Sequence, residues 1–118
     1  MTRYLALCAY DDGPWQPAAL TDDTNEIVGF VMHAVDPTDQ SFWVGGLVID
    51  QARQRRGYGR AAMDALIDRA RRDGHSNVAL SYQPDNTAAR ALYTALGFVE
   101  TGETEDNEVV ARLVLDHP

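Results

Sequence analysis

The feature of this sequence that most constrains its fold is a buried-strand pattern followed closely by an amphipathic helix. Residues 41–49, SFWVGGLVI, form an apolar and partly β-branched run that predicts a buried strand. In residues 58–73, Ala62, Leu66 and Ala70 recur on one helical stripe, with Met63 and Ile67 beside them. A strand that leads through a short loop into a helix indicates a domain in which sheet and helices share one core.

The rest of the chain continues this pattern with further strands and one more helix. Strands are expected at residues 18–21, 26–35, 78–82, 98–103 and 109–115, and a helix at residues 87–96. Residues 2–10 weakly favour a helix, although they also alternate tolerably as a strand. Asn86 is the expected N-cap of the later helix, and Gly45 with Gly46 marks an expected bulge in the buried strand. The order (α)-β-β-β-α-β-α-β-β indicates an α/β domain with a mixed sheet.

Length and cysteine content limit the class of protein. At 118 residues the chain has room for one core, so a single domain spanning residues 1–118 is expected. Cys8 is the one cysteine and cannot form an internal disulfide, which fits a reducing cytosol. No apolar run reaches membrane-spanning length and no basic-then-apolar leader opens the chain, so a cytoplasmic location without membrane contact is expected. Three scattered histidines and one cysteine show no metal-ligand spacing, so no metal is expected.

The positive charges are concentrated in one short stretch of an otherwise acidic chain. The net charge is −8 and there is no lysine, yet seven of the ten arginines lie in residues 53–72. A sequence pI of about 4.6 argues against nucleic acid as the partner, because nucleic-acid binding normally needs a broad basic face. The basic stretch is therefore either a solvated helix face or a small site for an anion.

The loop at residues 54–59, QRRGYG, favours the anion site. It follows the buried strand and opens the central helix, where free N–H groups and the helix dipole attract an anion. Gly57 and Gly59 allow a ligand to approach the backbone closely. Arg55, Arg56 and Arg60 oppose the dipole in the free protein, but they become favourable once a polyanion lies between them. The loop therefore predicts a ligand that carries phosphate.

A second motif identifies the class of this ligand. Residues 86–98 read NTAARALYTALGF. Together with the Q-x-x-G-x-G of the loop, this N-x-x-A-x-x-L-Y-x-x-L-G-F pattern resembles the GNAT superfamily of acyl-CoA-dependent N-acyltransferases. The strings FVMHAVDPTDQSFWVGGLVIDQARQRRGYGRAAM and SYQPDNTAARALYTALGFVETGE resemble the bacterial diamine and spermidine acetyltransferases within it. The resemblance covers residues 18–115 and implies a GNAT-like mixed, mostly antiparallel sheet with flanking helices.

The resemblance also implies a role for each residue of these motifs. Backbone amides of the loop and of the helix start would bind the pyrophosphate of CoA, which implies a cofactor site at Gln54, Arg55, Arg56, Gly57, Tyr58, Gly59 and Arg60. Leu47, Val48 and Ile49 would hydrogen-bond the pantetheine arm through main chain, where their strand splays from the next. An amide of that segment would polarise the thioester carbonyl. Asn86 would contact the cofactor near its sulfur, and Tyr93 would bind there and protonate the departing CoA thiolate. Taken without the resemblance, Tyr93 is also typical of a core tyrosine and Asn86 of a plain N-cap.

The sequence departs from the family in two respects. The N-terminal strand and first helix of the family are missing, and residues 2–10 match at most the second helix. Either another subunit, as in a homodimer, supplies the missing wall of the acceptor pocket, or the pocket is unusually open. Many members carry a carboxylate on the strand before the loop, whereas SFWVGGLVI has none. Candidates for the general base are therefore drawn from elsewhere in the chain: Glu26, His33, Asp50 and Tyr82.

These observations predict an acetyl-CoA-dependent N-acetyltransferase. The expected acceptor is the primary amine of a small molecule, with a polyamine or diamine first, because the resemblance and the acidic chain both favour a cation. The alternative is a GNAT-like module that binds acyl-CoA without turnover, or a partner subunit, and the short N-terminus keeps this alternative open.

Overall fold

The fold was determined as a computed structural model, which describes residues 15–50 and 57–115. The elements follow the chain in this order: β1 (Gln16–Thr21), β2 (Ile27–Val35), β3 (Phe42–Ile49), α2 (Tyr58–Arg72), β4 (Asn77–Tyr82), α3 (Thr87–Ala95), β5 (Val99–Glu105) and β6 (Glu108–Val114). Within the described residues the expected helices and strands are all present, and their ends differ from the expected ones by at most two residues. The helix expected at residues 2–10 lies outside the described residues.

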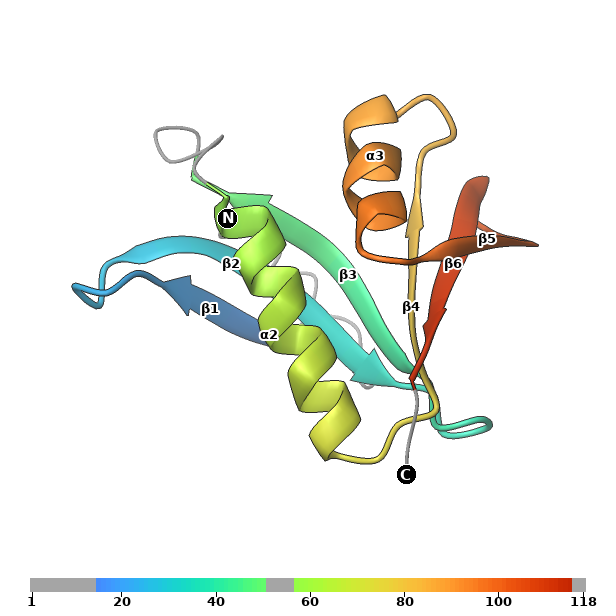
Figure 1. The fold of residues 1–118 in the computed structure, drawn as a ribbon, viewed down its shortest axis with the longest axis horizontal. Coiled ribbons are helices and arrows are strands. Elements are labelled where there is room, and N and C mark those ends of the chain that lie inside the picture. The colour runs from blue at the N-terminus through green and yellow to red at the C-terminus, as the bar shows by residue number, and fades with distance from the viewer. Residues whose placement is uncertain (1–14, 51–56, 116–118) are drawn as a thin grey trace.

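The strands of the described chain form one six-stranded sheet with the order β1-β2-β3-β4-β6-β5. Neighbouring strands are antiparallel except for β3 and β4, which are parallel. The predicted mixed, mostly antiparallel α/β fold is thus confirmed. The last strand, β6, lies between β4 and β5, so the C-terminal hairpin extends the sheet with its later strand inside (Figure 1). No helix of the described chain is long and apolar enough to cross a membrane.

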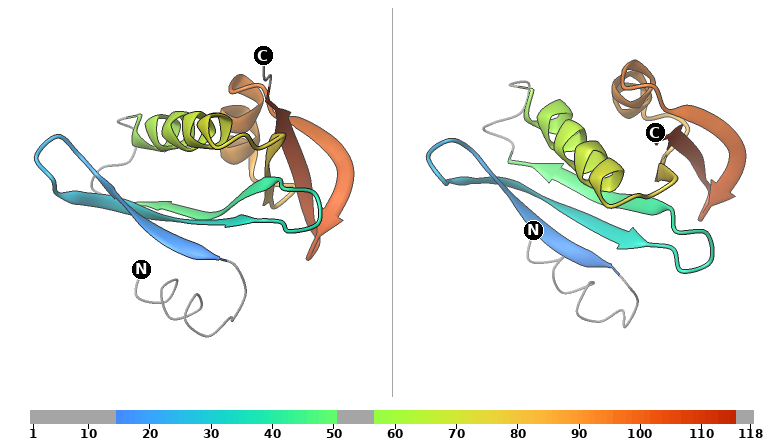
Figure 2. Two further views of the ribbon diagram at one scale, coloured as in Figure 1. Left: turned by 90° about the horizontal axis from the view of Figure 1, so that it is seen from below. Right: turned by 60° about the horizontal axis from the view of Figure 1, so that its bottom comes forward.

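Helix α2 covers the face of the sheet that holds the core. The residues of its predicted apolar stripe are all buried: Ala62, Met63, Leu66, Ile67 and Ala70. They pack against alternate residues of the central strands, among them Val31, Phe42 and Val78. Helix α3 lies over the same face, which Figure 2 shows with the sheet nearly edge-on. The opposite face of the sheet is therefore free of α2 and α3.

A bulge in β3 shifts its register against β2. Phe30 pairs with Val48 and Met32 pairs with Gly45, so β3 carries one residue more than β2 between these pairs. Gly46, within the bulge, has a φ of 54°, which favours glycine. The bulge predicted at Gly45 and Gly46 is confirmed. Such a bulge bends a strand, and here it lies where β3 leaves its neighbour β4.

Strands β3 and β4 separate after a short paired stretch. Their described pairing runs from Phe42 opposite Val78 to Val44 opposite Leu80. Beyond that point β3 continues to Ile49 and β4 to Tyr82, and Figure 1 shows the two strands diverging beneath the helices. Main-chain groups of β3 after Val44 are thus outside the β3–β4 ladder, so the splay that the resemblance implied is present.

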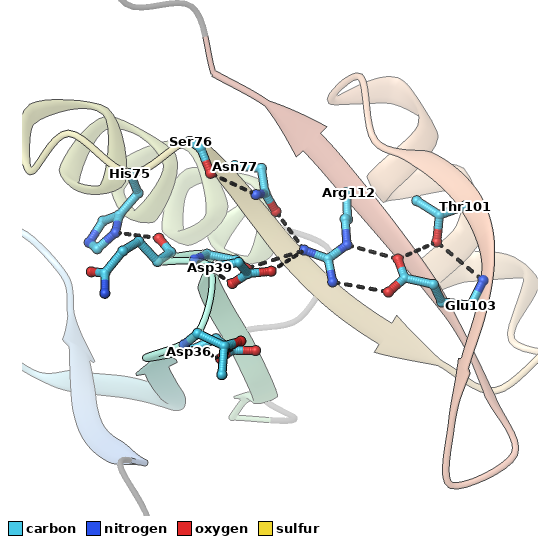
Figure 3. Close-up of polar contacts among 11 residues, drawn as sticks. Asp36, Asp39, His75, Ser76, Asn77, Thr101, Glu103 and Arg112 are labelled. Atoms are coloured by element: carbon cyan, nitrogen blue, oxygen red, sulfur yellow. Dashed lines mark hydrogen bonds and ion pairs between the residues drawn. The ribbon is translucent and has the colours of Figure 1, made fainter.

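Arg112 of β6 ties the closed end of this splay to the C-terminal hairpin (Figure 3). Its guanidinium donates to both carboxylate oxygens of Glu103, with Nε–Oε1 and Nη2–Oε2 distances of 2.9 and 3.1 Å. Nη1 also donates to Asn77 Oδ1 at 2.9 Å and to Ser41 Oγ at 3.2 Å. The Arg112 Cζ lies 5.3 Å from the centroid of the Trp43 ring. Hydrogen bonds from Arg112 are the main reason that the pKa of Glu103 lies below its usual value.

We expect Arg112→Leu to lower the free energy of unfolding by about 2 kcal/mol, because it removes charge-assisted hydrogen bonds to β4, to β5 and to the segment before β3. Urea denaturation at pH 7 measures this loss. The deficit should shrink as the pH falls below about 4, since a carboxyl with a lowered folded-state pKa stabilises above its unfolded pKa and not below its folded one. Arg71→Leu, at an exposed pair with Asp68, is the matched control and should change stability by less than about 0.5 kcal/mol. Equal losses in both variants would contradict the role given to Arg112.

Candidate active site

A cleft opens on the helix side of the described chain, where β3 and β4 splay apart. It has a volume of about 520 Å³. Its walls come from β3, the first turn of α2 and the start and middle of α3. The lining residues are Leu47, Ile49, Gly57, Tyr58, Gly59, Asn86, Ala88, Ala89, Leu92 and Tyr93. We call it the helix-side cleft, and it brings together residues that are far apart in the sequence.

The first turn of α2 forms the end of this cleft. The N-cap is Gly57, whose φ of 79° suits glycine and which offers no side-chain cap. The first turn contains no acidic residue, so its N–H groups and the positive end of the dipole face the cleft without a carboxylate from that turn. Arg60 is exposed and its side chain is not part of the wall. Gln54, Arg55 and Arg56 lie outside the described residues.

Helix α3 supplies the apolar wall of the helix-side cleft. Asn86 is its N-cap and accepts a hydrogen bond from the Ala89 N–H at 3.1 Å, as predicted. None of the residues in α3 is fully buried, although Ala89 and Tyr93 pack against the core, and Ala88 and Leu92 line the cleft. An amphipathic helix with an incompletely covered apolar face fits a ligand that covers it. The sequence analysis did not select Ala88, Ala89 or Leu92, because alanine and leucine at helical spacing are typical of any core.

Tyr93 lies where the helix-side cleft meets the sheet. Its ring is held between Tyr82 and Phe98, with centroid distances of 5.7 and 5.8 Å. Burial raises the pKa of the Tyr93 hydroxyl above its usual value, so this phenol is protonated at neutral pH. The ring therefore packs as a core tyrosine does, while the residue also lines two clefts. The packing of the ring agrees with the reading as a core tyrosine, and the role at the cofactor stays a prediction.

Two further clefts continue the site through the splay to the opposite face of the sheet. The first, of about 250 Å³, lies between β3 and β4; we call it the wedge. Tyr93 and Leu47 line it together with Ser81 and Glu108. The second, of about 430 Å³, is lined by Trp15, Trp43 and four carboxylates, and we call it the acidic cleft. Its carboxylates are Asp36, Glu105, Asp106 and Glu108.

Glu108 lines both the wedge and the acidic cleft, and it is the charged residue among those that line both. It is half-buried at the first position of β6. Its Oε1 accepts from Ser81 Oγ at 2.8 Å and its Oε2 accepts from Gln83 Nε2 at 3.2 Å. The sequence analysis missed Glu108, because it appeared only as part of the acidic turn EDNE between two strands. Only the pairing of β6 with β4 brings it beside Ser81.

Of the four proposed general bases, Tyr82 is the one that lines the wedge, whereas Glu26, His33 and Asp50 do not. His33 lies on the helix side of β2, stacked on Phe42 at 5.6 Å, and burial is the first cause that lowers its pKa, followed by the charge of Arg69. The Tyr82 hydroxyl donates to Glu100 Oε2 at 2.6 Å, so it is engaged on another contact.

Like His33, the remaining two candidates lie away from the walls of these clefts. Glu26 is exposed in the turn before β2, and Asp50 follows the end of β3. Neither residue lines the helix-side cleft, the wedge or the acidic cleft among the described residues. The geometry therefore does not support a base at Glu26, His33 or Asp50, and at Tyr82 the hydroxyl that would act is bonded to Glu100. The physical reason is that β-strand alternation and turn position, not nearness in sequence, decide which face each side chain occupies.

The combined site is suited to transfer of a group between two substrates that enter from opposite faces. A dipole-bearing helix end and an apolar wall meet at Tyr93 on one side, and carboxylates gather on the other. Within residues 15–50 and 57–115, histidine, cysteine and carboxylate side chains form no group of three that could hold a metal ion. Proton donors, proton acceptors and main-chain dipoles are the chemical groups that these walls present.

Comparison with known proteins gives a family match. The acetyltransferase (GNAT) family matches residues 2–98. Mycothiol acetyltransferase of Renibacterium salmoninarum is 38% identical over 81 residues, which are 65% of this chain and 24% of that protein. The [ribosomal protein bS18]-alanine N-acetyltransferase of Escherichia coli (strain K12) is 41% identical over 54 residues, 46% of this chain and 36% of that protein. The matches thus span well under half the length of both curated relatives, and neither is named for a diamine or spermidine.

Solved structures share the fold. The crystal structure of the ribosomal-protein-S18-alanine N-acetyltransferase from Escherichia coli has a TM-score of 0.76 at 24% identity and covers 97% of this chain and 77% of that one. A GNAT family acetyltransferase from Elizabethkingia anophelis, solved with acetyl-CoA bound, has a TM-score of 0.78 at 13% identity and covers 98% and 84% of the two chains. At these identities the likeness concerns the arrangement of strands and helices.

Proposed function

Since this chain belongs to the acetyltransferase (GNAT) family, we propose that it transfers the acetyl group of acetyl-CoA to a primary amine. The observation that carries the proposal is the helix-side cleft, in which the splayed β3, the start of α2 and Tyr93 meet. Acetyl-CoA is a substrate of this reaction and supplies the activated acyl group. The cleft shares Leu47, Asn86, Ala89 and Tyr93 with the wedge, so an acyl group at the tip of a long thioester would have access to the acidic cleft beyond.

The described residues fit the CoA part of this substrate. The α2 N-terminus, with Gly57 and Gly59 close to the ligand path, suits the pyrophosphate. Main chain of Leu47 and Val48 lies outside the β3–β4 ladder and suits the amides of the pantetheine arm. Ala89 and Leu92 give the arm an apolar wall, and Asn86 stands at the end of that wall. Tyr93, which lines the wedge, is the proposed proton donor for the leaving thiolate.

The proposed acceptor is a cationic amine of a small molecule, with a polyamine or diamine as first candidate. Support comes from the acidic cleft, in which the carboxylates of Asp36, Glu105 and Asp106 surround the approach to the wedge. The negative potential of these carboxylates raises the local concentration of cations and repels an anionic acceptor. Trp15 lines the same cleft and adds an aromatic ring against which an ammonium group packs favourably, whereas the Trp43 ring already contacts the Arg112 guanidinium. The named relatives act on other acceptors, so a peptide that begins with alanine is the competing candidate.

The test is release of free CoA thiol from acetyl-CoA with an amine panel of spermidine, putrescine, free amino acids and a peptide that begins with alanine. We expect turnover with a cationic amine and a kcat/KM that falls as salt is raised from about 20 to 200 mM, because salt screens the carboxylates. Calorimetry with CoA and with its pantetheine fragment checks the pyrophosphate site, and CoA should bind at least about tenfold tighter.

The outcomes separate the parts of the proposal. Acetyl-CoA binding without thiol release from any amine would favour the alternative, an acyl-CoA-binding module without turnover. Best turnover with a neutral or anionic amino acid at both salt concentrations would contradict the cationic acceptor and leave acetyl transfer in place. Equal affinity for CoA and pantetheine would contradict the pyrophosphate site at α2.

A further inference from the structure

We infer that Glu108 is the carboxylate that binds the acceptor's ammonium group and removes its proton, an assignment that rests on the proposed acetyl transfer. Glu108 lines both the acidic cleft, where a cationic amine would enter, and the wedge, where Tyr93 stands. Among the described side chains that line both the acidic cleft and the wedge, that of Glu108 is the charged one. The strand before the α2 loop contains no acidic or histidine side chain that could take this role.

The surroundings of Glu108 fix its carboxylate in place. Ser81 Oγ donates to Oε1 and Gln83 Nε2 donates to Oε2, at 2.8 and 3.2 Å. Both donors lie on or directly after β4, so they hold the carboxylate towards the splay. Each carboxylate oxygen accepts more than one hydrogen bond, so an ammonium group can bind without displacing these donors. A half-buried and oriented carboxylate is suited to take a proton from a bound amine.

The opposed placement of Glu108 and Tyr93 gives the reaction a base and an acid. The wedge is lined by Tyr93 from α3 and by Glu108 from β6, with Gly46 and Leu47 of β3 also in its wall. A thioester carbonyl between them would have the amine on the Glu108 side and the departing sulfur on the Tyr93 side. No other described carboxylate lines the wedge.

The proposed step balances in atoms and protons. The acceptor ammonium gives one proton to the Glu108 carboxylate, and the neutral nitrogen attacks the thioester carbon. A C–N bond forms and the C–S bond breaks, and the sulfur takes a proton from the Tyr93 hydroxyl. The second proton lost by the nitrogen returns to the Tyr93 phenolate. Glu108 releases its proton to water, so the cycle yields an acetylated amine, free CoA thiol and one proton.

Glu108→Gln tests the inference, because glutamine keeps the shape and can accept from Ser81 but cannot take a proton. With spermidine, or with the alanine peptide if that is the better acceptor of the wild type, we expect kcat at pH 7 to fall about 100-fold. Activity of the variant should recover by about tenfold per pH unit between pH 7 and 9, because free amine then becomes available without a base. Calorimetry should show the affinity for acetyl-CoA changed less than about twofold, since Glu108 does not line the helix-side cleft.

Two matched variants distinguish proton transfer from charge alone. Glu105→Gln removes a carboxylate of the acidic cleft that does not reach the wedge, and it should raise KM for the amine with kcat nearly unchanged. Glu26→Gln, in the exposed turn before β2, should leave both constants unchanged.

Each result decides the matter. A large fall in kcat that recovers with pH supports Glu108 as the base. A Glu108→Gln variant with wild-type kcat, or one whose loss of activity is as large at pH 9 as at pH 7, would overturn the inference. Turnover by the wild type would still uphold the proposed function in that case. Absence of turnover by the wild type with every amine of the panel would overturn both.

Discussion

Replacing Tyr93 with phenylalanine should lower turnover about 100- to 10,000-fold, the usual contribution of general acid–base catalysis. The hydroxyl is the atom removed, whereas the ring contacts with Tyr82 and Phe98 remain available to phenylalanine. Burial raises the pKa of the Tyr93 hydroxyl, so it carries its proton at neutral pH and can deliver it to a thiolate. Steady-state kinetics with acetyl-CoA and the best amine measure the fall, and calorimetry should show CoA affinity little changed.

Tyr82→Phe is the matched control for this prediction. It removes the hydroxyl of the neighbouring ring, which donates to Glu100 Oε2 at 2.6 Å rather than to a group of the proposed reaction. The variant should lose about 1 kcal/mol of stability, the usual contribution of one hydrogen bond. Its kcat should stay within about threefold of the wild type. If Tyr93→Phe turned over like the wild type, Tyr93 would be a core tyrosine only. If Tyr82→Phe lost activity to the same extent, the aromatic cluster as a whole would be needed rather than one hydroxyl.

Phe42→Ala should lower the free energy of unfolding by about 3–5 kcal/mol, the usual cost of truncating a buried phenylalanine. Phe42 is 2% exposed at the closed end of the splay, where it pairs with Val78. Its ring contacts the rings of His33 and His75 at 5.6 and 5.5 Å, so truncation leaves a cavity between several elements. Urea denaturation measures the loss.

Val99→Ala provides the control for the stability prediction. Val99 is a strand residue too, but it is 67% exposed on β5. Its truncation removes little buried area and should change stability by less than about 0.5 kcal/mol. A loss below about 1 kcal/mol in Phe42→Ala would mean that the core collapses around the cavity and that the closed end of the splay does not depend on this ring.

The proposed site combines residues from local sequence patterns with residues brought together by long-range strand pairing. Only the residues of the local patterns could be predicted from the sequence. Leu47, Gly57 and Asn86 belong to continuous strand–loop–helix patterns, and the described structure brings them to one cleft. Gln54, Arg55 and Arg56 belong to the same pattern but lie outside the described residues. Glu108 and Ser81 are brought together by strand pairing over 27 residues, which no local pattern encodes.

The candidate bases illustrate the same limit. His33 and Tyr82 were chosen by residue type, but strand alternation turns His33 towards Phe42 and a long-range partner engages the Tyr82 hydroxyl. Both outcomes depend on which strands become neighbours. The preference for a polyamine likewise came from resemblance and net charge, whereas the acidic cleft that now supports a cationic acceptor draws its lining from β3, β4, β5 and β6 and from segments beside the strands.

The sequence by itself determined the order of strands and helices, the buried stripe of α2, the Asn86 cap and the glycine bulge of β3. These features depend on side-chain periodicity and backbone freedom within a few residues, so short patterns predict them. Only the tertiary structure decided that β6 inserts between β4 and β5, that β3 leaves β4 after Val44, and that Glu108 therefore faces the wedge. The reason is that sheet order and register arise from hydrogen bonds and packing between distant segments, and their pairing is settled by the shared core rather than by any one segment.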